Sequence, residues 1–198
     1  MTEEVPRADT ARKILDLAER YAMQRGYHAF SFRDIADQLG IKPAAVHYHF
    51  RTKPQLVAEV LDRYRGRFRR WGRTVVGTPA ERLDAYLGLS RALVADGRID
   101  PFGVMAAEYD QVPDEVKLRL RELQAEIFGW FAALLDEGRQ GGAFRFDGPS
   151  DGKAAELACA VLGAQQLGRV CGLAAFEQVV AQVRRSVGLT ESATARCR

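Results

Sequence analysis

The chain has 198 residues, of which 47% are hydrophobic and 28% are charged, and its formal net charge is +3. A chain of this length can bury a real core and has room for one domain, or for a small domain and a larger one. It contains no apolar run of about 18 to 20 residues and no charged-then-apolar leader at residues 1–9, so it predicts neither a membrane span nor a secretory signal and favours a cytoplasmic protein.

Positive charge is concentrated in the first 74 residues. That segment holds 15 Lys and Arg against 9 Asp and Glu, a net charge of +6, whereas residues 75–198 carry a net charge of −3. A basic N-terminal end suits a surface that faces DNA, although a charge of this size does not identify a nucleic-acid binder by itself.

Residues 31–50 have the pattern of two short helices joined by a tight turn. Ser31 suits the N-cap of the first helix, and Asp34, three residues later, completes a capping-box pattern. The apolar face of this helix includes the small Ala36, which allows a second helix to approach closely. Gly40 then ends the helix, because glycine adopts a positive φ without steric cost.

The second helix of the pair is expected at about residues 42–49, with Pro43 in its first turn, where the missing N–H is not needed. Val46 and Phe50 are four residues apart and are expected to be its buried anchors. Its other side chains are small or able to form hydrogen bonds, as a helix in a DNA major groove requires: they are Ala44, Ala45, His47, Tyr48 and His49.

The start of the following helix has features of a phosphate site. Thr52 and Gln55 form a second capping-box pattern, and Lys53 lies between them. Unpaired N–H groups, the helix dipole and a lysine would meet there at a phosphate, which positions a protein on DNA without reading its sequence.

The sequence offers no catalytic, cofactor or metal site. His47 and His49 are about 200 degrees apart around a helix, whereas helical zinc ligands are three or four residues apart. We find no Ser-His-Asp pattern, no phosphate-binding glycine loop and no cysteine-rich metal spacing. We therefore expect no enzyme activity, metal or cofactor; the competing interpretations are a small helical enzyme and a ligand-binding module that no longer reads DNA.

Residues 10–61 resemble the N-terminal domain of the TetR family of transcriptional repressors. The resemblance covers roughly a quarter of the chain and rests on Arg25-Gly26-Tyr27, Ser31 with Arg33-Asp34-Ile35-Ala36, Leu39-Gly40-Ile41, His47-Tyr48-His49-Phe50, and Thr52-Lys53 with Leu56. It implies an all-α fold of about nine helices. A three-helix DNA-binding domain at residues 1–52 would precede a larger helical ligand-binding and dimerisation domain at residues 53–198, with the helix at 53–72 shared between them.

The resemblance also assigns roles to individual residues. It implies phosphate contacts from Ser31, Tyr48, His49, Thr52 and Lys53, and major-groove contacts from Lys42, Ala44, Ala45 and His47. The family most often has tyrosine at the position of His47, and often threonine or asparagine at that of Ala45. Alanine still contacts a thymine methyl group, and neutral histidine donates or accepts a hydrogen bond.

Apolar periodicity and Gly or Pro breaks predict the remaining helices at about residues 53–72, 79–95, 102–109, 114–139, 151–171 and 174–187. The first of these carries arginines at positions 63, 65, 69 and 70, for which a solvated face is the favoured interpretation. The helix at 151–171 is rich in alanine and glycine, which predicts either a self-complementary dimer face with the last helix or tight packing inside one subunit. The resemblance favours the dimer, and a dimer would read a palindromic operator on double-stranded DNA.

Large apolar or amphipathic side chains on these helices are candidates for a ligand pocket, although aromatic residues at helical spacing are usually core. They are Trp71, Tyr86, Met105, Tyr109, Phe128, Phe131 and Gln166. Glu108 is either a polar anchor for the ligand or an ordinary exposed carboxylate. The mechanism implied by the resemblance is release of DNA when a small-molecule effector binds the second domain.

The chain has three cysteines. Cys159 and Cys171 are 12 residues apart on one predicted helix, which places them about 18 Å from each other, too far for a disulfide. We expect these two and Cys197 to be ordinary thiols in a reducing compartment rather than redox sensors, with pairing between subunits left open.

Overall fold

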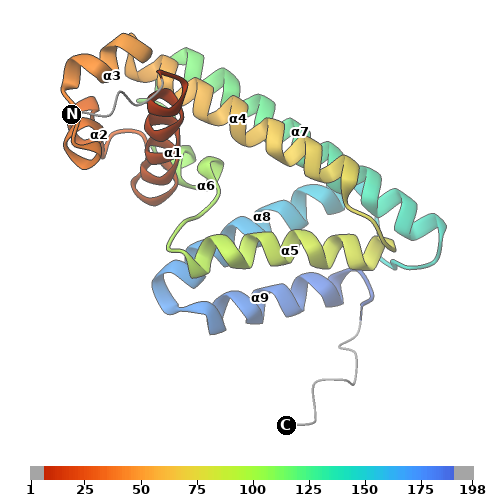
Figure 1. Cartoon of the computed structure of the whole chain (residues 1–198). Helices are drawn as coiled ribbons and strands as arrows, with labels where there is room; N and C mark the ends of the chain where they lie inside the picture. Colours follow the sequence, from red (N-terminus) through yellow and green to blue (C-terminus); the bar gives the residue numbers. More distant parts are fainter. Residues whose placement is uncertain (1–6, 190–198) are drawn as a thin grey trace. The chain divides into compact units, whose positions relative to one another are not determined.

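A computed structural model describes residues 7–189 (Figure 1). Within this range nine α-helices and one short 3-10 helix form, and there is no strand, so the expected all-α fold is confirmed. The helices are α1 Arg7–Arg25, α2 Phe32–Leu39, α3 Pro43–His49, α4 Lys53–Thr74, α5 Pro79–Ala95, α6 Pro101–Met105, η1 Ala106–Glu108, α7 Asp114–Gln140, α8 Ser150–Cys171 and α9 Leu173–Ser186.

The expected helix boundaries agree with these bounds to within a few residues. The largest difference is at residues 102–109, where a single helix was expected and α6 is followed by the 3-10 turn η1. None of the helices within residues 7–189 combines the length and the apolar character that crossing a membrane requires.

The chain forms two compact units. Unit 1 contains the described residues up to Arg69 together with Asp100–Gln124, and unit 2 contains Arg70–Ile99 and the described residues from Ala125 onward. The chain therefore passes between the units within α4, before α6 and within α7. The two units are defined by how the chain packs. They do not test the boundary expected after residue 52 between the DNA-binding domain and the ligand-binding domain, which stays a prediction.

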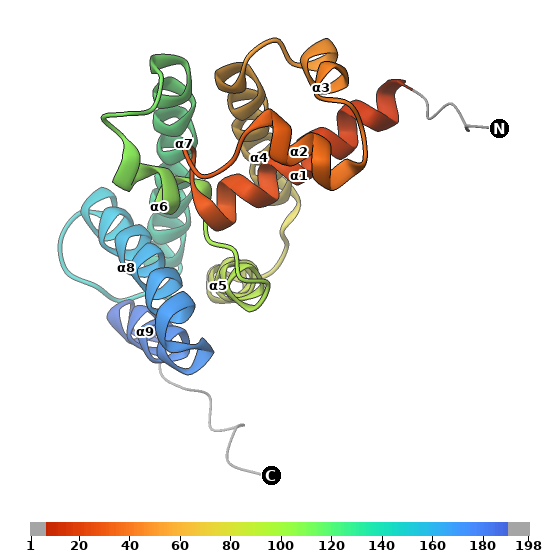
Figure 2. The same cartoon turned by 90° about the vertical axis from the view of Figure 1, so that its left-hand side faces the viewer.

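In unit 1, α1, α2 and α3 pack against one another, and α6 packs against α1 (Figure 2). Fully buried apolar side chains hold these helices together, among them Ile14, Ala18, Ile35, Ala36 and Val46. Asp100 is the N-cap of α6, and its buried carboxylate accepts bonds from the Phe102 N–H at 2.8 Å and the Tyr64 hydroxyl at 3.0 Å. Burial raises the pKa of Asp100, and these two bonds oppose the rise.

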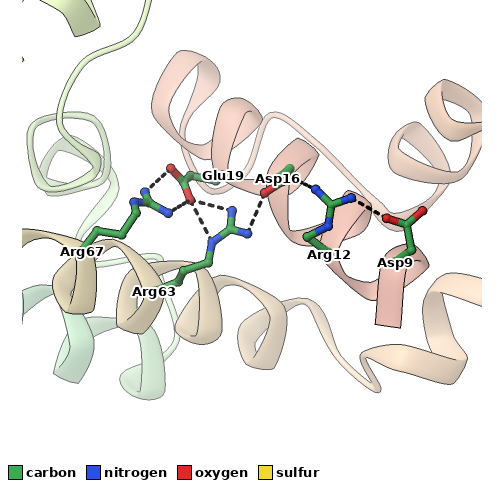
Figure 3. A network of polar contacts seen from close by, with 6 residues as sticks. All are labelled: Asp9, Arg12, Asp16, Glu19, Arg63 and Arg67. Atoms are coloured by element: carbon green, nitrogen blue, oxygen red, sulfur yellow. Dashed lines mark hydrogen bonds and ion pairs between the residues drawn. The ribbon is translucent and has the colours of Figure 1, made fainter. Parts of the chain in front are cut away.

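A polar network joins α1 to α4 (Figure 3). Glu19 of α1 is only 7% exposed, and its carboxylate accepts hydrogen bonds from Arg63 at 2.7 Å and from Arg67 at 3.0 Å. Arg63 also pairs with Asp16 at 2.7 Å. The interpretation of these arginines as a solvated face is therefore wrong for Arg63, because α1 places two carboxylates over this part of α4.

The same correction applies to Arg65, which pairs with Glu122 of α7 at 2.6 Å and with Asp62 at 3.2 Å. Arg119 of α7 completes this second cluster with a 3.0 Å bond to Asp62. Sequence spacing did not reveal either cluster, since each pairs residues more than 40 positions apart. Arg70, by contrast, is exposed as expected.

In unit 2, α5, α8 and α9 lie side by side (Figure 1). These helices approach one another closely at Gly168 of α8, where a Cβ atom would lie 2.7 Å from Val94 of α5 and 3.0 Å from Phe176 of α9. Gly163, also on α8, is exposed, and a Cβ there would meet nothing within 4 Å. The small residues of α8 therefore differ in their surroundings: Gly168 and the buried Ala154, Ala158 and Ala164 are explained by packing inside the subunit, and Gly163 is not.

Cys159 and Cys171 are both exposed and form no disulfide with each other. Cys197 lies outside the described residues.

Candidate DNA-binding site

The first helix of the pair starts with the expected capping box. The Ser31 hydroxyl accepts a bond from the Asp34 N–H at 3.3 Å, and the Asp34 carboxylate accepts from the Ser31 hydroxyl and N–H, each at 2.7 Å. These bonds lower the pKa of Asp34, with the hydroxyl the larger cause. Since this geometry fixes the residue at which α2 begins, it also fixes where the turn to α3 starts.

The turn between α2 and α3 has the geometry that the sequence predicted. Gly40 has φ +66°, a left-handed conformation that favours glycine, and the Ile41 N–H donates to the Ala36 carbonyl at 3.0 Å. Val46 and Phe50 are buried, at 0% and 3% exposure, and anchor α3 against the core of unit 1. One face of α3 is therefore held inside, and the other remains available.

The available face of α3 carries the residues expected at the major groove. Lys42, Ala44, His47 and Tyr48 are exposed, and Ala45 and His49 are half-buried. Tyr48 is 65% exposed. The His47 ring lies edge-on to the buried Phe32 ring, with 4.8 Å between centroids. This contact helps to fix the orientation of the His47 side chain. A short helix with exposed polar tips and a buried anchoring face has the form that enters a major groove.

The start of α4 differs from the expected capping box. The Thr52 hydroxyl accepts from the Gln55 N–H at 3.3 Å, as expected, but the Gln55 side chain accepts from the N–H of Arg51 at 3.2 Å. The reciprocal bond is displaced by one residue, from the N–H of Thr52 to that of Arg51. The box is therefore only half formed.

Lys53 is already engaged with unit 1. Its ammonium donates to the Phe30 carbonyl and lies 4.6 Å and 4.5 Å from the ring centroids of Tyr27 and Phe30. Burial lowers the pKa of Lys53, and the charges of Glu108 and Asp34 oppose that change. Sequence reasoning assigned Lys53 to a phosphate alone and missed this contact; the only available signal was the pair of aromatic residues that precedes α2.

Three of the residues expected in a ligand pocket come together in unit 2. The Tyr86 ring lies 6.1 Å from Trp71 and 4.8 Å from Phe131. Trp130, which the sequence analysis missed, joins them with its ring 5.1 Å from Trp71 and 5.5 Å from Tyr86. Trp130 directly precedes Phe131 in the sequence, so helical spacing did not predict that both rings lie in the same cluster. We refer to Trp71, Tyr86, Trp130 and Phe131 as the aromatic cluster.

The other expected pocket residues are not part of this cluster. Phe128 is half-buried on α7, and Gln166 is exposed on α8. Met105 and Tyr109 belong to unit 1, where Met105 is fully buried and the Tyr109 hydroxyl accepts from Arg121 at 2.7 Å. Glu108 is half-buried rather than exposed, and its carboxylate accepts from the Tyr27 N–H at 2.7 Å; its role as a ligand anchor stays a prediction.

The surface of α8 and α9 is hollowed. A groove of about 370 Å³ is lined by Glu156, Leu157, Ala160, Val179, Gln182, Val183, Arg185 and Ser186. Apolar side chains are also exposed on α8, with Leu167 at 46% and Val170 at 81%. Such exposed apolar residues mark a surface suited to contact with another protein.

The helix pair, with its capped first helix and its anchored second helix that exposes a polar face, defines a helix-turn-helix protein of the DNA-binding class. The sequence pattern described as "Bacterial regulatory proteins, tetR family" matches residues 14–60. The HTH-type transcriptional repressor KstR2 of Rhodococcus jostii is 32% identical over 169 residues, which cover 72% of this chain and 74% of that protein. The chain belongs to the TetR family of DNA-binding transcriptional regulators.

Other TetR-family proteins match this chain over a shorter region or at lower identity. The HTH-type transcriptional regulator TtgR of Pseudomonas putida is 27% identical over 57% of this chain, but the match spans only 45% of that protein. A crystal structure of a TetR-family regulator from Agrobacterium tumefaciens has 26% identity and a TM-score of 0.86, covering 91% of this chain and 98% of the other. The likeness to solved structures therefore extends through both units.

Proposed function

We propose that this regulator is a repressor that binds a palindromic operator as a homodimer and releases it when a small, largely apolar effector binds. The observation that carries the proposal is the exposed face of α3 between two capped helices. The relatives named as repressors support this direction of control, although FasR of Mycolicibacterium smegmatis, which matches over only 30% of this chain, is named as an activator. We expect the protein to act in the cytoplasm, where genomic DNA is accessible.

In this proposal the exposed residues of α3 contact the DNA. Lys42, Ala44, Ala45 and His47 would face the base edges, while Tyr48 and His49 would contact phosphates. Ser31, Thr52 and Lys53 would add phosphate contacts from the helix starts. The Ser31 hydroxyl and N–H both donate to Asp34, so Ser31 would contact a phosphate only by exchanging its hydroxyl bond. The Lys53 ammonium donates to the Phe30 carbonyl and keeps further N–H donors for a phosphate.

The outer face of α8 and α9 is the proposed dimer surface. Gly163 is exposed with open space around it, so its lack of a side chain has no explanation inside the subunit. Close approach of the same helix from a second copy would use that space, and the exposed Leu167 and Val170 would be covered. Two copies related by a two-fold axis would present two α3 helices to half-sites about 34 to 36 Å apart.

The aromatic cluster supports an apolar effector. Four large rings in unit 2 supply the apolar and aromatic lining that small-molecule sites use, and rearrangement of these rings would admit a flat apolar molecule. If the effector prefers the protein without DNA, operator DNA must weaken effector binding by the same factor.

The test is footprinting on the DNA upstream of the chain's own gene, combined with sedimentation of the protein and of its DNA complex. We expect protection of an inverted repeat by a dimer. Protection without a repeat, or binding by a monomer, would contradict the palindromic dimer. A protein that binds no DNA at any salt concentration would support the ligand-binding module instead.

A further inference from the structure

Glu108 makes a contact for which the proposed function gives no reason. It lies in η1, immediately after α6, and is half-buried. Its Oε2 atom accepts hydrogen bonds from the backbone N–H groups of Tyr27 at 2.7 Å and His28 at 3.4 Å. Both N–H groups belong to the loop at residues 26–30, which connects α1 to α2. The 3-10 turn after α6 is thus bonded to the entrance of the helix-turn-helix.

The loop is shaped to receive this carboxylate. Gly26 has φ +91°, and a Cβ atom at this position would lie 2.7 Å from Oε1 and 3.0 Å from Cδ of Glu108. The carboxylate therefore lies directly against the backbone at Gly26, where any side chain would collide with it. Gly26 directly follows the last residue of α1, and its N–H donates to the Ala22 carbonyl at 3.2 Å; its positive φ ends the helix there.

The opposite end of the same loop is held by Lys53. Its ammonium donates to the Phe30 carbonyl and lies over the rings of Tyr27 and Phe30. Ser31, the N-cap of α2, follows Phe30 directly. The loop is therefore fixed at its start by η1 and at its end by the first residue of α4, and its last residue precedes the cap that sets the position of α2.

We propose that Glu108 is a positioning residue for sequence-specific DNA recognition. By holding the loop at residues 26–30, its carboxylate fixes the start of α2 and, through Phe30, the place of Lys53 at the start of α4. This inference rests on the proposed function and deepens it, since α6 and η1 become part of the machinery that reads DNA. Specific binding needs helices at fixed positions, whereas non-specific binding needs mainly charge. Removal of the carboxylate should therefore reduce specificity more than general DNA affinity.

The experiment compares Glu108→Ala and Glu108→Gln with the control Glu115→Ala. Glu115 is an exposed residue in the first turn of α7 whose charge also acts on Tyr27, so the control removes a similar charge without a backbone bond. We expect Glu108→Ala to weaken binding to the upstream DNA by about tenfold, as loss of a charged hydrogen bond does, with binding to unrelated DNA little changed.

The two other variants test whether the lost hydrogen bond is the cause of the weaker DNA binding. Glu108→Gln should recover much of the affinity, because its amide oxygen accepts the Tyr27 N–H, and Glu115→Ala should bind the upstream DNA at least as well as wild type. Equal losses on specific and unrelated DNA, or the same behaviour in Glu108→Ala and Glu115→Ala, would overturn the proposal.

Amide hydrogen exchange of the protein without DNA separates this inference from the proposed function. Exchange at residues 26–30 should accelerate in Glu108→Ala and stay close to wild type in Glu115→Ala, while α8 is unaffected in both. Unchanged exchange at residues 26–30 would overturn the positioning role, whether or not the protein binds DNA. Accelerated exchange, with a wild type that shows no preference for its upstream DNA, would count against the proposed function alone.

Discussion

Different kinds of contact hold the helices together inside unit 1 and inside unit 2. In unit 1, polar contacts with defined directions join the helices, and one of them is the contact of the buried Glu19 of α1 with Arg63 and Arg67 of α4. In unit 2, apolar packing is tight where Gly168 brings α8 against α5 and α9. Polar pairs occur there too, such as Arg184 of α9 with Asp84 of α5 and Arg91 with Glu177, but the carboxylate side chains of Asp84 and Glu177 are 43% and 46% exposed, against 9% for Glu19.

This difference matches the tasks proposed for the two units. Hydrogen bonds and ion pairs constrain both distance and angle, so they suit a unit whose helices must keep fixed positions on DNA. Apolar contacts are less directional and tolerate repacking at modest cost, which suits a unit that would rearrange around a small molecule. Each unit should therefore depend for its stability on its own kind of contact.

The largest expected effect is at the tight contact of unit 2. Gly168→Val adds atoms where a Cβ alone would lie 2.7 Å from Val94, so α8 must move away from α5 and α9. We expect a loss of about 3 kcal/mol in the free energy of unfolding, at the upper end for overpacking. Urea unfolding followed by circular dichroism measures it, and a loss below about 0.5 kcal/mol would show that this approach is not tight.

Gly163→Ala is the matched control on the same helix. Because a Cβ there meets nothing within the subunit, the subunit should gain up to about 1 kcal/mol from helix propensity. If α8 forms the dimer surface, the same change should alter the dimer dissociation constant, measured by sedimentation equilibrium. A dimer of unchanged affinity would place Gly163 outside the interface.

The next effect concerns the network of unit 1. Glu19→Ala leaves Arg63 and Arg67 without their buried carboxylate, and we expect a loss of about 2 kcal/mol, since both arginines are partly exposed. Glu177→Ala, which breaks the exposed pair of unit 2, should cost less than about 0.5 kcal/mol. Chemical unfolding of both variants side by side compares them, and equal costs would remove the distinction between the units.

The smallest effect is at the start of α2. Ser31→Ala removes a side-chain cap and should cost about 1 kcal/mol at pH 7. Because bonds from Ser31 lower the pKa of Asp34 in the folded protein, their contribution is present above the unfolded pKa of Asp34 and is lost as pH falls through the lowered value. The difference between variant and wild type should shrink below about pH 4, and a difference independent of pH would contradict the capping box.

In unit 1, the sequence predicted where helices begin and end better than which side chains meet between helices. Ser31, Gly40 and the anchors Val46 and Phe50 were identified because caps, turns and short periodicity depend on neighbours within a few positions. The bond from the Tyr27 N–H to Glu108 joins residues 81 positions apart, so no local pattern indicates it.

In unit 2 the same limit applies to the pocket residues. Periodicity identified Trp71, Tyr86 and Phe131 as inward-facing, but it gave no reason to add Trp130. It also grouped Met105 with these residues, although Met105 is buried in unit 1. Period alone tells which face of a helix is buried, and the neighbour that buries it depends on the path of the whole chain.

The most direct measurement of the central claim is the affinity of the protein for its upstream DNA across a range of salt concentrations. Wild type should be compared with Lys42→Ala, at the exposed start of α3, and with Arg91→Ala, an exposed cation of unit 2. We expect tight binding that weakens steeply with salt. The salt slope should fall by up to about 0.9 in Lys42→Ala, which removes one positive charge from the surface that faces DNA, and stay unchanged in Arg91→Ala. Binding that is insensitive to salt, or equally affected by both variants, would contradict DNA recognition through α3.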